Sequence, residues 1–422
     1  MGIVFTVDGQ PVEVADAGAT LLDVLRDQLG VRSPKDGCSP QGQCGCCTVL
    51  VDGQPRVACV TPARRVAGRA VTTIDGLDEE ERAAWAEAFV AAGASQCGFC
   101  TPGIVLRLAA LGDARSDSAR VEQALLAHLC RCTGWQTIIE AATCPPRSRD
   151  ASRDLAAASR DLAAASRRAT IEGGAHQRVA ADVALGRGGF AEDTAPAGAL
   201  VAVPSAHRPG EWAVGETLAA ARRAAGKVQG RRTTVEARPP LALPPGDWDL
   251  ALRTSWVEPA YLEPDASWCE PDGEPYTPLA NGGAFGGKVA SIAPEAARRL
   301  SREYGRAVRV VLAREDVVRL GPKRPPVAAG LRADGTGLLR VVRTPGIAGA
   351  IRRVLPAVEI EEVDVAGPPT SSALRAAGWA EAAVLAAALA GKATVVAPSG
   401  ARASAVLDDN RLLVAVRCGD PL

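Results

Sequence analysis

The sequence has no excess of charge of either sign, because its 422 residues include 48 Lys and Arg and 48 Asp and Glu. A balanced chain has no overall field that would draw it onto nucleic acid or an anionic membrane surface. We therefore expect neither as a partner. A chain of this length predicts about two to four domains, each large enough to bury a core.

Patterns of secretion and membrane insertion are also missing. Residues 1–10 do not show a charged segment followed by an apolar one, as a secretory signal would. The longest apolar run, Ala382 to Ala390, is far shorter than the roughly 20 residues that span a bilayer. We expect a cytoplasmic protein.

Nucleotide-binding loops are absent as well. No G-x-G-x-x-G follows a strand-like run, which argues against a dinucleotide-binding domain. Gly282, Gly287 and Lys288 fit the spacing of a phosphate-binding loop. However, Val289 stands where Ser or Thr should coordinate magnesium, so a nucleotide site is not predicted.

Residues 1–77 predict a small α+β domain. Two pairs of β-prone runs each surround an Asp-Gly turn and predict hairpins, 2–7 with 11–14 and 48–51 with 56–60. Thr20 can cap a helix over 21–29, which Gly30 ends. A further strand near 70–74 completes a group of strands around one helix.

Residues 78–145 change to a helical pattern and predict four helices, over 79–92, from Thr101-Pro102, over 117–129 and over 134–142. Residues 146–169 then carry an SRDLAAA repeat, whose single Leu per seven residues favours a helical or mobile linker over a coiled coil. Residues 170–422 predict α+β or α/β structure. The expected elements there are a strand and helix at 212–227, a helix at 293–304 and a buried strand at 306–313.

Cysteine is the most informative residue type. Ten of the 12 cysteines precede Pro145, and without a secretory signal such clustering favours metal or redox chemistry over disulfides. A first set lies in KDGCSPQGQCGCCTVLVDG and comprises Cys38, Cys44, Cys47 and Cys59. The glycines around it allow backbone N–H groups to turn toward an anionic iron–sulfur cluster.

A second set lies in QCGFCTPG and LCRCTG and comprises Cys97, Cys100, Cys130 and Cys132. Each pair precedes a predicted helix, whose N-terminus carries positive partial charge. Two pairs of cysteines can instead hold a structural zinc, and a lone C-x-x-C can be a thiol–disulfide motif. The other four cysteines are expected to be ordinary buried or surface residues, namely Cys46, Cys144, Cys269 and Cys418.

The two motifs, in this order, resemble the iron–sulfur subunit of the xanthine dehydrogenase family of molybdenum hydroxylases over residues 3–143. The resemblance implies a ferredoxin-like β-grasp domain at 1–77 and a four-helix domain at 78–145, with one [2Fe–2S] cluster on each cysteine set. It also implies that Gln96 contacts the pterin of the molybdenum cofactor, whereas Gln96 alone would suggest a surface glutamine. The family usually has four residues between the first two cysteines, but five separate Cys38 from Cys44.

The segment NGGAFGGK resembles a G-G-x-F-G-G-K loop of the molybdopterin-binding subunit of the same family. This implies that residues 170–422 form a partial molybdopterin-subunit-like region, in which Phe285 and Gly286 approach the molybdenum centre through their backbone. The region departs from the family in three ways. One glycine of a cofactor loop is lost at Ala376, no flavin domain intervenes, and no G-x-G-E-like motif supplies a catalytic glutamate, so the catalytic residues are unknown.

The resemblance implies an iron–sulfur oxidoreductase component. Electrons from the hydroxylation of a heteroaromatic or aldehyde substrate would pass through the helical-domain cluster and the β-grasp cluster to a flavin or other acceptor. A flavin-bearing subunit and a separate molybdopterin subunit are the implied partners. Three alternatives remain open: a pure electron-transfer or docking subunit, a homologue whose back region is only a scaffold, and a zinc-stabilised interaction protein.

Overall fold

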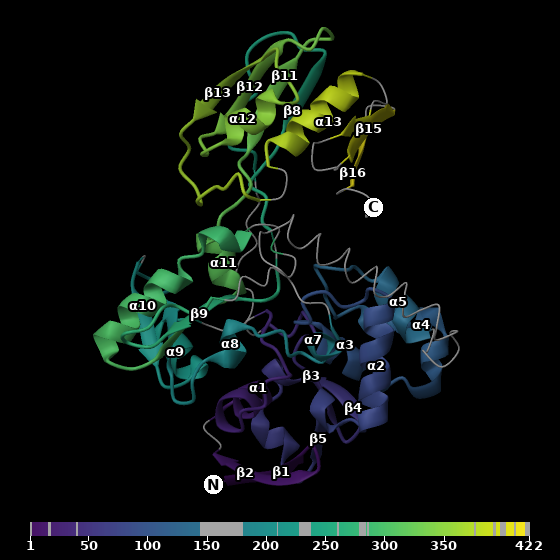
Figure 1. The fold of residues 1–422 in the computed structure, drawn as a ribbon, viewed down its shortest axis with the longest axis vertical. Coiled ribbons are helices and arrows are strands. Elements are labelled where there is room, and N and C mark those ends of the chain that lie inside the picture. The colour runs from purple at the N-terminus through teal and green to yellow at the C-terminus, as the bar shows by residue number, and fades with distance from the viewer. Residues whose placement is uncertain are drawn as a thin grey trace.

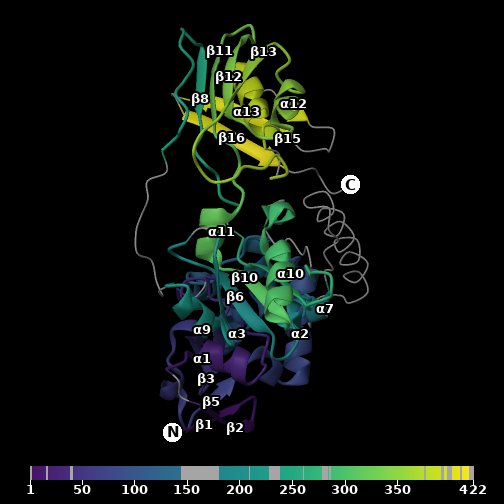
Figure 2. The same cartoon turned by 90° about the vertical axis from the view of Figure 1, so that its left-hand side faces the viewer.

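The computed structural model describes residues 2–15, 18–38, 41–143, 180–208, 210–227, 238–259, 261–277, 284, 287–374, 377–390, 394–396, 402–408 and 411–417. The linker predicted over 146–169 lies outside these ranges. Two lobes are visible from two directions (Figures 1 and 2). The N-terminus lies in one lobe, and the C-terminal helices and strands lie in the other. No helix in the described ranges is long and apolar enough to cross a membrane.

The first unit is a five-stranded sheet in the order β2-β1-β5-β3-β4. Its strands are β1 (Gly2–Val7), β2 (Gln10–Ala15), β3 (Thr48–Val51), β4 (Gln54–Val57) and β5 (Ala70–Thr72). Both predicted hairpins form. Asp8 and Asp52 have φ of 51° and 49°, and the glycine after each is also left-handed, as a type I′ turn requires.

The helix after Thr20 differs from the prediction in kind, because only α1 (Leu21–Asp23) is α-helical and η1 (Val24–Gln28) is a π-helix. Its predicted cap is confirmed. The Thr20 hydroxyl accepts from the Asp23 amide at 3.2 Å, and the Asp23 carboxylate accepts from the Thr20 amide at 2.9 Å. Leu21 of α1 and Val24 and Leu25 of the π-helix η1 are buried in the core against the sheet.

The second unit contains the four predicted helices, α2 (Glu79–Ala91), α3 (Thr101–Ala109), α4 (Ser118–Leu125) and α5 (Gln136–Thr143), with the 3₁₀ turn η5 (Gly112–Ser116). They enclose a core that includes Phe89, Ile104 and Leu108. α4 ends at Leu125, four residues before Leu129, where the sequence predicts its end. The chain leaves the helix there, and the Leu129 amide donates to the Cys44 carbonyl at 3.0 Å instead.

The third unit is a four-stranded sheet in the order β7-β6-β10-β9. It contains β6 (Leu200–Pro204), β7 (Trp212–Gly215), β9 (Asp265–Cys269) and β10 (Val308–Leu312), with helices α7 (Ala181–Ala184), α8 (Ala191–Thr194), α9 (Leu218–Ala224), α10 (Ala293–Tyr304) and α11 (Arg314–Leu320). α10 has the predicted bounds, and Gly305 ends it with a φ of 61°. β10 is buried throughout, as its apolar sequence predicts.

The other lobe contains a four-stranded sheet in the order β13-β12-β11-β8. Its strands are β8 (Leu250–Arg253), β11 (Val327–Leu331), β12 (Gly337–Val342) and β13 (Val358–Val363), and α12 (Ile347–Arg352) and α13 (Trp379–Leu389) pack on it (Figure 1). β14 (Thr394–Val396), β15 (Arg402–Asp408) and β16 (Arg411–Arg417) form a further three-stranded sheet. The chain is therefore a multidomain α+β protein.

Two candidate iron–sulfur sites

The first cysteine set comes together where the loop after η1 meets β3 and the 3₁₀ turn η2 (Ala58–Val60), and its four members are buried. The thiols of Cys44 and Cys59 both hydrogen-bond Cys38, and Cys59 also contacts Cys47. Backbone amides add to this chain of sulfurs. The Gln41 amide donates to Cys38 Sγ at 3.3 Å, and the Cys59 amide donates to Cys47 Sγ at 3.4 Å.

η2 replaces the end of a predicted strand. The sequence predicts a strand from Arg56 to Val60, but β4 ends at Val57. The 3₁₀ turn that follows directs the Cys59 amide at Cys47, as a continuing strand would not. The deviation from the expected strand is therefore part of the candidate site.

The second cysteine set has the same connectivity. Cys100 and Cys132 both hydrogen-bond Cys130, and the sulfurs of Cys132 and Cys97 are 3.5 Å apart. Cys97 and Cys100 lie in the loop before α3, and Cys130 and Cys132 lie between α4 and α5. The Thr133 amide and hydroxyl lie 3.5 Å and 3.2 Å from Cys130 Sγ.

In each set, one central sulfur lies beside two others. Hydrogen bonds from Cys44 and then Cys59 lower the pKa of the Cys38 thiol, and bonds from Cys100 and Cys132 lower that of Cys130. The thiolate is the form that binds metal. In the described ranges, no group of three His, Cys, Asp or Glu is arranged to hold a metal ion. A [2Fe–2S] cluster takes four thiolates shared between two irons, and a chain of closely paired sulfurs fits it.

Glycines allow the cysteine loops to approach their neighbours closely. A Cβ on Gly45 would lie 2.3 Å from the His128 ring, and one on Gly98 would lie 1.9 Å from the Val183 carbonyl oxygen. Both residues also have φ above 70°, which L side chains rarely adopt. Side chains at these two positions would push the cysteine loops away from the elements that cover them.

A backbone hydrogen bond joins the two cysteine sets. Cys44 of the first set accepts from the amide of Leu129, whose next residue, Cys130, belongs to the second set. Beside this bond, Thr48 Oγ1 lies 3.0 Å from His128 Nε2. Burial, with a smaller contribution from Arg107, lowers the pKa of His128 to about 4, so the imidazole is neutral near pH 7.

The third unit covers the second cysteine set. A Cβ on Gly188 would lie 2.9 Å from the Cys97 carbonyl oxygen, so only glycine fits there. Phe99 and Phe190 pack edge to face with ring centroids 5.2 Å apart. Arg131, between the last two cysteines, donates to the Pro259 carbonyl at 3.3 Å. The cysteine loops are therefore embedded against the chain's own later residues.

A buried ionic network connects the β-grasp unit to the third unit. Lys35 Nζ forms an ion pair with Asp193 and donates to the Gly186 carbonyl at 2.9 Å. Arg26 Nη2 lies 2.9 Å from Asp193 Oδ1, and the Arg309 guanidinium lies 3.7 Å from Asp27. No local sequence pattern predicts these contacts, because the partners lie up to 282 positions apart, as Arg309 and Asp27 do.

The structure places the residues implied by resemblance to the molybdopterin subunit only in part. Gln96 is half-buried in the loop before Cys97. Phe285 and Gly286 lie outside the described ranges. Lys288, from the same loop, is buried, with its Nζ 2.9 Å from Glu263 and 5.2 Å from the centre of the Tyr261 ring. A carboxylate thus holds the lysine that a phosphate-binding loop would offer to a nucleotide.

Glu263 predicts a pH-dependent stability. Burial, which the nearby Lys288 opposes, raises the pKa of Glu263 to about 7. The unfolded chain releases this proton near pH 4.3, so stability should fall as pH rises from about 4 to 7 and then level off. The loss should be on the order of 3 kcal/mol. Thermal unfolding between pH 5 and 8 should show this slope in the native protein and a flatter one in Glu263→Gln. Equal slopes would contradict the assignment.

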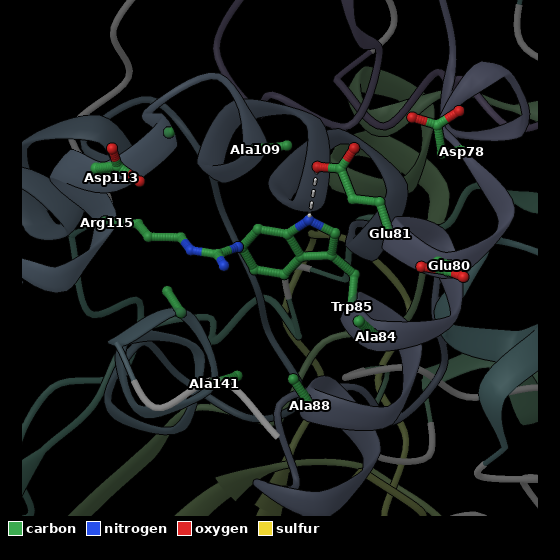
Figure 3. Close-up of a pocket in the computed structure, with 12 residues that line it drawn as sticks. Asp78, Glu80, Glu81, Ala84, Trp85, Ala88, Ala109, Asp113, Arg115 and Ala141 are labelled. Atoms are coloured by element: carbon green, nitrogen blue, oxygen red, sulfur yellow. Dashed lines mark hydrogen bonds between the residues drawn. The ribbon is translucent and has the colours of Figure 1, made fainter. Parts of the chain in front are cut away.

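A separate hollow of about 540 Å³ lies in the four-helix unit, between α2, η5 and the last turn of α5. Figure 3 shows Trp85 at its centre, with Glu81 at the indole nitrogen and Arg115 over the ring. The indole Nε1 lies 3.4 Å from the Glu81 carboxylate, and the Arg115 guanidinium carbon lies 5.2 Å from the ring centre. Its lining includes no cysteine.

Residues 5–68 match the family described as "2Fe-2S iron-sulfur cluster binding domain", and residues 73–143 match "[2Fe-2S] binding domain". The chain is 40% identical over 140 residues to a probable xanthine dehydrogenase subunit of Bacillus subtilis (strain 168), covering 32% of this chain and 80% of that protein. It is 43% identical over 145 residues to "Aldehyde oxidoreductase" of Megalodesulfovibrio gigas, covering 33% of this chain but 16% of that protein.

A solved structure resembles nearly the whole chain. Aldehyde oxidoreductase from Desulfovibrio gigas aligns with a TM-score of 0.61 over 92% of this chain and 60% of that chain. The sequence identity is 21%, so this likeness shows the fold alone. The residues after 180 therefore share a fold with a larger protein of which this chain spans about three-fifths.

Proposed function

Because the chain belongs to the xanthine dehydrogenase family of molybdenum hydroxylases through its iron–sulfur units, we propose that it is an electron-transfer component of such an enzyme. The first cysteine set would hold one [2Fe–2S] cluster and the second set another. When bound, the clusters would supply one-electron transfer between a molybdenum site, where a heteroaromatic or aldehyde is hydroxylated, and a flavin or other acceptor.

The observation that carries this proposal is that the two groups of four cysteines lie next to each other, with their loops joined by a backbone hydrogen bond. The Cys44 carbonyl and the Leu129 amide, 3.0 Å apart, join a residue of one set to the neighbour of Cys130 in the other. Two redox sites in such contact suit sequential electron transfer better than two independent structural metals. The sulfurs are also largely shielded from water, which influences cluster potentials.

The chain's own residues would position and tune these sites. Amides of Gln41, Cys59 and Thr133 donate to sulfurs, and such hydrogen bonds stabilise negative charge on a thiolate. Gly45 and Gly98 let the cysteine loops pack closely against His128 and Val183, respectively. The neutral His128 would fix the first set against the second through Thr48 without adding charge.

The partners follow from what lies around the two sets. The third unit already covers the second cysteine set through contacts at Gly98, Gly188 and Arg131, which supports a molybdenum site formed with residues 170–422 or completed by a separate molybdopterin subunit. A flavin-bearing subunit or other acceptor would receive the electrons. None of the ten described cysteines forms a disulfide, as expected for the cytoplasmic setting that we propose.

Metal analysis of one anaerobic preparation tests the proposal. We expect about four iron atoms per chain, no zinc, and two distinct S = 1/2 EPR signals after reduction. Zinc without iron would contradict the proposal, because two pairs of cysteines would then be structural zinc ligands.

The same preparation separates the alternative function, an electron-transfer or docking subunit without a molybdenum site of its own. The observation that favours it is the match to the probable xanthine dehydrogenase subunit of Bacillus subtilis, because 140 residues of this chain align with 80% of that protein. Iron without molybdenum, from cells that supply molybdenum to a control hydroxylase, would support this alternative. Stoichiometric molybdenum would support the fused hydroxylase component.

A further inference from the structure

Cys46 is a buried ninth cysteine that belongs to neither set. It lies between Cys44 and Cys47 of the first set in the sequence, and its side chain is fully shielded from solvent. Its backbone carbonyl accepts from the Lys35 amide at 3.1 Å, so its place in the loop is fixed. The only other cysteine of the described ranges that lies outside both sets, Cys269, is equally buried but sits on β9.

The sulfur of Cys46 lies beside that of Cys44. The two thiols lie side by side, and in this structure the Cys46 S–H donates to the Cys44 carbonyl oxygen, with Sγ and O 3.9 Å apart. A Cβ on Gly37 would lie 3.1 Å from Cys46 Sγ, 3.2 Å from Cys44 Sγ and 3.2 Å from Phe99. The two sulfurs and the aromatic ring therefore share one small space.

This space adjoins the contact between the two cysteine sets. A Cβ on Gly103, in the first turn of α3, would lie 2.2 Å from the Gly45 carbonyl oxygen and 3.1 Å from the Cys46 carbonyl carbon. The neighbouring Cys44 carbonyl accepts the Leu129 amide. Cys46 is thus packed where the first set faces the second.

We propose that Cys46 is a positioning residue that raises the reduction potential of the β-grasp cluster by donating its S–H to the Cys44 sulfur. Cys38 is the central sulfur of the first set and completes its chain of four, so Cys46 is not needed as a ligand. Once Cys44 is a metal-bound thiolate, its sulfur can only accept, and the Cys46 S–H turns to it from the Cys44 carbonyl oxygen, 3.9 Å away in this structure. Reduction adds negative charge to the cluster, and a hydrogen bond to a ligating sulfur stabilises that charge.

This inference rests on the proposed function, and the test separates the two. EPR-monitored redox titration of the full-length protein would compare the native chain with Cys46→Ala, Cys46→Ser and the matched control Cys269→Ala. We expect all four to keep about four irons per chain and both signals. In Cys46→Ala, the potential of the β-grasp cluster alone should become more negative. Cys46→Ser, which restores a donor of similar size, should recover or exceed the native value, and Cys269→Ala should leave both potentials unchanged.

Three results would overturn the inference. An unchanged potential in Cys46→Ala would mean that its thiol does not donate to the cluster. Equal shifts of both clusters would point to a general packing change. Loss of one signal with half the iron would make Cys46 a ligand. Failure to find any cluster in the native protein would instead contradict the proposed function itself. If Cys46→Ala does not fold, Cys46→Ser decides: a potential below the native value would overturn the inference, because the Ser hydroxyl is at least as strong a donor as the thiol.

Discussion

Replacing Cys97 with Ala is expected to remove one of the two EPR signals of the reduced protein and to leave the other in place. The chain of sulfurs in the second set ends at Cys97, which contacts Cys132 at 3.5 Å. Without its thiolate, one iron of that cluster loses a ligand. Iron should fall from about four to about two atoms per chain. Iron quantification and EPR on the same sample measure both effects.

Cys38→Ala should have the complementary result and remove the other signal. Cys38 is the residue whose spacing departs from the family, yet its sulfur contacts both Cys44 and Cys59 in the structure. Cys269→Ala is the control, because this buried cysteine on β9 belongs to neither set. Retention of both clusters in Cys38→Ala would show that another sulfur, Cys46, takes its place. Loss of both signals from either variant would show that the two sites do not form independently.

Local signals in the sequence predicted the elements that carry the cysteines. The two Asp-Gly turns require left-handed backbone at Asp8 and Asp52, and both hairpins form. The Thr20 cap is set by its hydroxyl and by Asp23, three residues later. These features depend on neighbours within a few residues, which is why a reading of the sequence could find them.

The features that the sequence did not predict depend on contacts between segments that are distant in the chain. The π-helix at η1 and the 3₁₀ turn at η2 replace an α-helix and a strand end because tertiary packing outweighs local propensity there. The Cys44–Leu129 hydrogen bond joins residues with no shared motif. Resemblance to a family grouped the eight cysteines, but it did not indicate that one backbone hydrogen bond connects them or that Cys46 lies beside Cys44.

The buried network at Asp193 would be costly to disrupt. Lys35 is 1% exposed and Asp193 is 12% exposed, and Arg26 shares the same carboxylate. Burial raises the pKa of Asp193, but Arg26 and Lys35 outweigh it and hold that pKa below its usual value. Asp193 therefore stabilises the fold in its ionised form, and this contribution is lost only in acid, as pH falls below about 4.

Asp193→Ala should destabilise the protein by about 3–5 kcal/mol at pH 7, because it leaves Lys35 and Arg26 buried without this carboxylate. Urea unfolding, followed by loss of the visible absorbance of the clusters, should show a lower midpoint. The control Glu216→Ala removes an exposed partner of Arg306 in the third unit and should change the midpoint far less.

The difference between the native chain and Asp193→Ala should also shrink below about pH 4, where the native carboxylate takes up its proton. A constant difference across this range would mean that the charge of Asp193 is not what stabilises the network. Equal midpoints for Asp193→Ala and Glu216→Ala would go further. They would mean that Lys35 and Arg26 find other partners, and that this ionic network is not what holds the β-grasp unit against the third unit.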